Sequence, residues 1–111
     1  MKMRKLTKTV LENRVNRGIR FMNRQYGRYW LRKIDPETLA LESGNACVLG
    51  QVEGDYDNAI DLHNLKFEDS ARAGFTLESS ADGDWDRLTR TWKDSIVKLQ
   101  KLFNVGPNRA G

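Results

Sequence analysis

Large apolar side chains recur at the spacing of an α-helix in the last third of this 111-residue chain. They follow one another at intervals of three, four, four, three and four residues, namely Trp85, Leu88, Trp92, Ile96, Leu99 and Phe103. Because an α-helix has about 3.6 residues per turn, this spacing places all of them on one face. Gly106 and Pro107 cannot continue the helix. The pattern predicts an amphipathic helix over 84–103 and a frayed tail over 104–111.

A second helical pattern covers the beginning of the chain. Its apolar face recurs at intervals of four, four, three and four residues, namely Leu11, Val15, Ile19, Met22 and Tyr26. The opposite side carries five arginines, namely Arg14, Arg17, Arg20, Arg24 and Arg28. This arrangement predicts a basic amphipathic helix over 7–32, capped by Thr7 or Thr9.

Two glycines leave the C-terminal boundary of that helix undecided in the sequence. Gly18 and Gly27 each weaken a helix by about 1 kcal/mol relative to alanine. A break at Gly27 would leave residues 28–33 as a separate turn that presents Tyr29 and Trp30.

The middle of the chain predicts two further helices. Apolar residues repeat every four positions at Val48, Val52, Tyr56 and Ile60. This repeat predicts one helix over 45–63, although Gly50 and Gly54 are unfavourable inside a helix. The run 67–73 predicts a short helix ended by Gly74.

Leu39 and Leu41 lie in a stretch without helical period, where they could plug the core. No segment shows sustained alternation with period two, the signature of a half-buried strand. We therefore expect an all-α fold. It would be one compact helical domain over 1–111, a bundle of about four helices, two long, one medium and one short, with a short irregular insert.

Charge is divided sharply along the sequence. Residues 1–33 carry eleven basic and one acidic residue, 34–83 carry eleven acidic and two basic residues, and 84–111 carry six basic and three acidic residues. The acidic middle could fold against the basic N-terminal segment and neutralise it. Alternatively, the basic face stays free for an acidic partner or a nucleic acid. We place self-neutralisation slightly ahead, although exposed ion pairs contribute only about 0–1 kcal/mol each.

Residues suited to catalysis or metal binding are few. The chain has one cysteine, Cys47, and one histidine, His63, which excludes an internal disulfide or a closed Cys/His metal site. On one continuous helix these two residues lie about 24 Å apart, too far for a hydrolytic pair unless the helix breaks at Gly54. Cys47 is expected to serve packing. We predict no catalytic residue, metal or cofactor, and no enzyme.

Membrane insertion and export are not expected. No apolar run approaches the roughly 18 residues of a spanning helix. No apolar stretch of about 7–15 residues follows the basic N-terminus, as it does in a signal peptide. The sequence therefore predicts a cytoplasmic protein without a membrane partner.

Part of the chain resembles small proteins encoded by actinobacteriophages and their hosts. The shared pattern, approximately "ID…L.L…C.LGQ..G.Y…GF…W..LT..W", spans residues 34–96, from Ile34-Asp35 through Cys47, Tyr56 and Gly74-Phe75 to the run 84–92. It covers a little over half of the chain and does not reach the basic N-terminal segment. The resemblance implies a phage or prophage accessory protein in a bacterial cytoplasm and transfers no catalytic residue.

Taken together, these features predict a non-catalytic protein-binding module that acts on a host or phage protein through its basic, aromatic N-terminal helix. Arginine, tyrosine and tryptophan are enriched at interface hot spots. The candidate contact residues are Arg14, Arg17, Arg20, Arg24, Arg28, Tyr29 and Trp30. The alternative is a nucleic-acid-binding protein that uses the same arginine-striped helix. A homodimer formed through that helix is a further alternative.

Overall fold

The computed structural model describes residues 6–78 and 81–106, and these form five α-helices, one 3-10 helix and no strand. The elements are α1 (Lys8–Tyr26), η1 (Arg28–Lys33), α2 (Val48–Glu53), α3 (Tyr56–His63), α4 (Phe67–Arg72) and α5 (Asp84–Leu102). The predicted all-α class is confirmed. The described residues contain six helices rather than about four.

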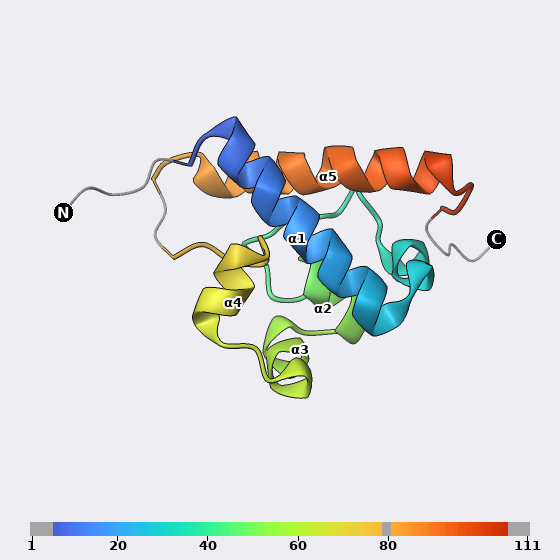
Figure 1. Ribbon diagram of the computed structural model, residues 1–111, viewed down its shortest axis with the longest axis horizontal. Coiled ribbons are helices and arrows are strands. Elements are labelled where there is room, and N and C mark those ends of the chain that lie inside the picture. The colour runs from blue at the N-terminus through green and yellow to red at the C-terminus, as the bar shows by residue number, and fades with distance from the viewer. Residues whose placement is uncertain (1–5, 79–80, 107–111) are drawn as a thin grey trace.

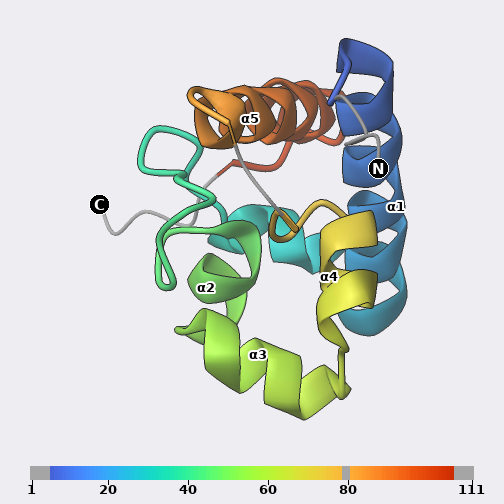
Figure 2. The ribbon, with the colours of Figure 1, turned by 90° about the vertical axis from the view of Figure 1, so that its left-hand side faces the viewer.

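The helices surround one core. In Figure 1, α5 runs across the top and α1 descends obliquely from its N-terminal part, with α2, α3 and α4 below. Figure 2 shows α1 along one side, next to both α5 and α4. In agreement with these views, α1 contacts α5, η1 and α4, and α2 contacts α3 and η1. None of the described helices is both long enough and apolar enough to cross a membrane.

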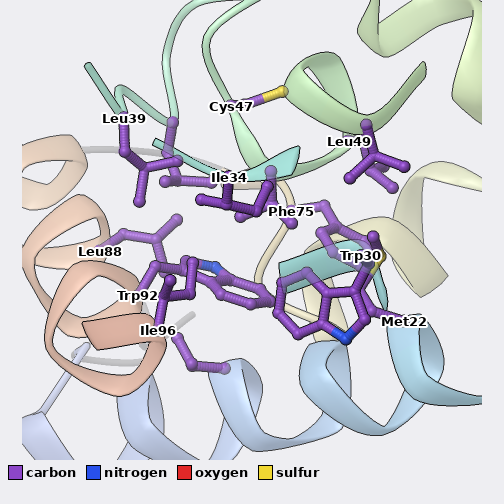
Figure 3. Close-up of a cluster of buried hydrophobic side chains, with 14 of the residues drawn as sticks. Met22, Trp30, Ile34, Leu39, Cys47, Leu49, Phe75, Leu88, Trp92 and Ile96 are labelled. Atoms are coloured by element: carbon purple, nitrogen blue, oxygen red, sulfur yellow. The ribbon is translucent and has the colours of Figure 1, made fainter. Parts of the chain in front are cut away.

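Two tryptophans lie at the centre of the core. Trp30 from η1 and Trp92 from α5 point into the same buried cluster (Figure 3). Their indole N–H groups are both satisfied, Trp92 Nε1 by the Gly74 carbonyl at 2.7 Å and Trp30 Nε1 by Asn23 Oδ1 at 2.8 Å. Buried Trp rings need such acceptors, because an unpaired N–H in the core is costly.

The packing of α1 on α4 and α5 depends on a glycine. A Cβ at Gly18 would lie 2.6 Å from the Trp92 ring and would also collide with the Ala73 carbonyl oxygen. The glycine that weakens α1 as an isolated helix therefore permits three helices to meet. Leu39 and Leu41, expected to plug the core, are both buried.

The prediction of one helix over 45–63 is wrong. Gly54 adopts the left-handed conformation (φ 90°) and ends α2, and the Asp55 side chain then caps α3 by accepting a hydrogen bond from the Asn58 N–H. Only glycine adopts this conformation without strain. The break therefore follows from local backbone chemistry, although the four-residue repeat of apolar side chains continues across it.

At the end of α1, the alternative of a break at Gly27 is the correct one, since this glycine has φ 67° and separates α1 from η1. Thr7 rather than Thr9 caps α1, accepting a hydrogen bond from the Val10 N–H at 3.2 Å. The predicted helices over 67–73 and 84–103 correspond to α4 and α5. Positions 107–111 of the predicted tail lie outside the described residues.

Candidate binding surfaces

Two of the seven predicted contact residues are buried. Trp30 is 1% exposed, because η1 turns its side chain inward while Tyr29 points outward. Arg14 lies at the edge of the apolar face of α1 and is also buried, with Nη1 2.8 Å from Glu78 Oε1. The expectation that η1 would present Trp30 is therefore corrected, and neither residue can be the centre of a surface contact in this fold.

Neutralisation within the domain is limited. Among the described residues, Arg14–Glu78 is the one ion pair that joins the basic N-terminal segment to the acidic middle. Arg17 instead donates from Nε to the Arg72 carbonyl at 2.9 Å. Most of the positive charge on α1 is thus left exposed to solvent.

The first exposed region is a groove between α1 and α4, here called the arginine groove. It has a volume of about 290 Å³ and is lined by Arg17, Arg20, Phe21, Arg24, Leu65, Asp69, Arg72 and Ala73. Three predicted residues meet there, and Arg72 joins them from the acidic part of the sequence. Its contribution was missed because it depends on the packing of α4 against α1, which no local pattern encodes.

The second exposed region lies where η1 meets the end of α5, and is here called the aromatic end. A hollow of about 370 Å³ is lined by Arg28, Tyr29, Arg32, Phe103 and Val105. The Arg28 guanidinium carbon lies 4.0 Å from the centroid of the Phe103 ring, and that of Arg32 lies 5.1 Å from the centroid of the Tyr29 ring. Both distances are those of cation–π contacts.

Phe103 and Arg32 are functional candidates that the sequence analysis missed. Phe103 continues the apolar period of α5 and was expected on its buried face. It lies one residue beyond the last residue of α5 and is 36% exposed. The spacing of apolar residues along a helix does not show where the neighbouring helices that bury its apolar face end. It therefore could not predict that the Phe103 ring is partly exposed.

A polar cluster joins α1, α2 and α3. The Tyr26 hydroxyl lies 2.6 Å from Glu53 Oε2 and 2.5 Å from His63 Nε2. Burial, with the neighbouring Glu53 carboxylate, raises the pKa of Tyr26 far above its ordinary value of 10.0. The phenol therefore stays protonated and donates its hydrogen bond to Glu53 Oε2, so a hydrogen bond with His63 requires the tautomer of His63 that carries its hydrogen on Nε2. This arrangement suits a structural tie between helices more than an activated nucleophile.

Cys47 occupies the N-cap position of α2. Its sulfur accepts a hydrogen bond from the Gly50 N–H at 3.3 Å. Burial raises the pKa of the Cys47 thiol, and hydrogen bonds from the backbone offset this only in part. A neutral buried thiol is a poor nucleophile. Within 6–78 and 81–106, no three His, Cys, Asp or Glu side chains gather closely enough to hold a metal ion.

No family model, no curated protein and no solved structure matches this chain. What the protein binds is therefore inferred from the chemistry of its own two surfaces.

Proposed function

We propose that this chain is a non-catalytic protein-binding module whose contact surface is the aromatic end. The observation that carries the proposal is a concentration of exposed apolar side chains beside arginines. Tyr29 (69% exposed) and Phe103 (36%) line this end, and Leu102 (73%) directly precedes Phe103 in the chain, whereas the other exposed large apolar residues of the described chain, Leu62 and Phe67, lie singly on α3 and α4. Tyr and Arg are enriched at the centres of protein interfaces, and clustered exposed apolar groups mark interaction sites.

The chemistry of the aromatic end favours an acidic partner. Arg28 and Arg32 are each held against an aromatic ring, and neither forms an ion pair with a described carboxylate. Stacking on a ring restricts a guanidinium before binding, so less side-chain entropy is lost when a partner arrives. A protein segment that places carboxylates beside an apolar side chain would complement both the charge and the rings.

The resemblance to actinobacteriophage proteins supports the biological setting of this proposal. It favours an accessory protein that acts on a host or phage protein in a bacterial cytoplasm. The resembling segment, residues 34–96, contains none of the residues that line the aromatic end, namely Arg28, Tyr29, Arg32, Phe103 and Val105. The identity of the partner would then depend on residues particular to this chain.

A pull-down from a nuclease-treated bacterial lysate tests the proposal. The tagged wild type is compared with Tyr29→Ser and Phe103→Ser, and with Leu62→Ser as a matched control, because Leu62 is 64% exposed on α3, away from the aromatic end. We expect one defined protein to be retained by the wild type and by Leu62→Ser and lost from the other two variants. Retention should persist in high salt, since aromatic anchors are screened less than phosphate contacts.

Other occupants would give different results. Recovery of nucleic acid alone, lost as salt rises, would overturn the proposal in favour of the nucleic-acid alternative. Concentration-dependent self-association that Tyr29→Ser abolishes would assign the aromatic end to a homodimer instead. A partner that Tyr29→Ser and Phe103→Ser still capture would place the contact elsewhere.

A further inference from the structure

The arginine groove gathers like charges that the fold does not neutralise. Arg17, Arg20 and Arg24 lie on successive turns of one side of α1, and Arg72 comes from α4. In the described part of the chain, none of the four forms an ion pair, although Asp69 lines the same groove. Four guanidinium groups therefore face one carboxylate.

The neighbouring hollow along α1 provides a comparison within the same molecule. It has a volume of about 500 Å³ and shares Arg17 and Arg72 with the arginine groove. There, Glu68 and Glu78 offset the arginines, and Arg14 is already paired with Glu78. The excess of positive charge is thus concentrated on the side of Arg20 and Arg24.

The groove is partly organised before any ligand binds. The hydrogen bond from Arg17 Nε to the Arg72 carbonyl fixes α4 against α1, and it leaves the terminal Nη groups of Arg17 without a hydrogen bond to described residues. Arg20 and Arg24 are exposed and also make no such bond. Arginines spaced three and four residues apart on a helix repel one another, and an anion between them would relieve that repulsion.

The groove also has apolar lining residues, namely Phe21, Leu65 and Ala73. Phe21 itself packs edge-on against His63 and Phe75, with ring centroids 5.2 Å and 5.5 Å apart. A ring held in this way is a fixed surface. The groove therefore offers both charge-assisted hydrogen-bond donors and an apolar contact surface.

We propose that the arginine groove binds a small phosphate monoester, with its phosphoryl group among the guanidinium groups and its apolar part over Phe21 and Leu65. Arginine binds phosphate oxygens in pairs, and a phosphate monoester carries about −1.5 to −2 charge at pH 7. Asp69 on the α4 side disfavours a long polyanion that would cross the groove. This site is separate from the aromatic end, so either proposal can fail without the other.

The inference is tested by titrating the protein with inorganic phosphate and, separately, with phenyl phosphate at constant ionic strength. Binding is measured from the changes in the NMR chemical shifts of the backbone amides in α1 and α4. We expect both probes to shift the amides around Arg17, Arg24 and Arg72, with phenyl phosphate binding about three- to tenfold more tightly because its ring contacts the apolar lining residues. Arg20→Gln and Arg24→Gln should each weaken binding by at least about tenfold.

Arg90→Gln is the matched control. Arg90 is an exposed arginine of α5 whose replacement makes the same change in net charge, and binding should be unchanged. The proposal is overturned if chloride causes the same shifts, or if Arg90→Gln weakens binding as much as Arg24→Gln. It is also overturned if single-stranded or duplex DNA binds the groove while phenyl phosphate does not. Circular dichroism checks that each variant is folded.

Discussion

The arginine groove and the aromatic end both expose arginines, yet their surroundings differ. In the groove, neither Arg20 nor Arg24 stacks on an aromatic ring of the described residues, and both line a small hollow together with Arg17 and Arg72. At the aromatic end, Arg28 lies over Phe103, with strongly exposed apolar side chains around it. Convergent guanidinium groups suit one compact anion, whereas stacked ones suit a larger partner with apolar groups. Arginine content alone would not separate these two surfaces.

The largest expected effect comes from the core that supports both surfaces. Trp92 stacks on Phe75, with ring centroids 5.7 Å apart, and packs against Gly18 of α1. We predict that Trp92→Ala lowers the free energy of unfolding by about 3–5 kcal/mol and impairs both surfaces together. Urea denaturation measures this loss. An unchanged midpoint would show that the two surfaces do not depend on a common core.

The next effect should separate the two surfaces. The Gln100 side-chain amide donates to the carbonyl oxygens of Leu31 and Ile34, both at 3.0 Å, and so ties η1 to α5. Gln100→Leu would remove both bonds, leaving the Leu31 carbonyl with the Ile34 N–H alone and the Ile34 carbonyl without a donor from the described residues, at a cost of about 1–3 kcal/mol. We predict weaker partner capture at the aromatic end and unchanged phenyl phosphate binding in the groove. Equal losses at both surfaces would mean that they are coupled.

A smaller effect should follow from removing the Tyr26 hydroxyl. We predict that Tyr26→Phe lowers the free energy of unfolding by about 1–2 kcal/mol, since Glu53 and His63 lose a shared partner. Because the pKa of Tyr26 is raised in the folded state, its contribution is fully present below about pH 10 and is lost as the pH rises further.

Urea denaturation from pH 8 upward compares the wild type with Tyr26→Phe. The free energy of unfolding of the wild type should fall more steeply above about pH 10 than that of Tyr26→Phe. The reason is that Tyr26 ionises more readily in the unfolded state than in the folded state, whereas phenylalanine does not ionise. Parallel profiles would contradict the placement of the phenol between Glu53 and His63.

The smallest effect distinguishes a binding site from a structural one. Without a ligand, Arg24→Gln should leave stability unchanged or raise it by about 0.2–0.5 kcal/mol, because it removes a like-charge neighbour of Arg20. Arg90→Gln again serves as the control for net charge. If Arg24→Gln instead lowers the melting temperature clearly, the groove arginines support the fold.

The sequence was sufficient to predict the long helices but not every boundary. The existence of α1 and α5 and the extent of α5 follow from three- and four-residue spacing, whereas the helix predicted over 7–32 ends at Tyr26, because Gly27 separates it from η1. The break at Gly54 was missed because a left-handed glycine and the cap at Asp55 interrupt the backbone without interrupting the apolar repeat.

The site was harder to predict than the fold because it depends on tertiary packing. The burial of Trp30 follows from the direction in which η1 turns after Gly27. Arg72 joins the groove only because Gly18 permits α1 to approach Trp92 and Ala73 closely. Counting charges along the sequence also favoured self-neutralisation, for which the described residues provide one ion pair, Arg14–Glu78.

The most direct test of the account compares one variant from each surface in the same capture experiment. Tagged Tyr29→Ser and tagged Arg24→Gln are each used as bait in a pull-down from nuclease-treated lysate. The amount of partner protein that each variant captures is compared with the amount captured by the wild type. The account predicts that Tyr29→Ser reduces capture at least about tenfold, as for an interface hot spot, while Arg24→Gln retains the partner at the wild-type level. The reverse pattern, with capture lost in Arg24→Gln and kept in Tyr29→Ser, would contradict it.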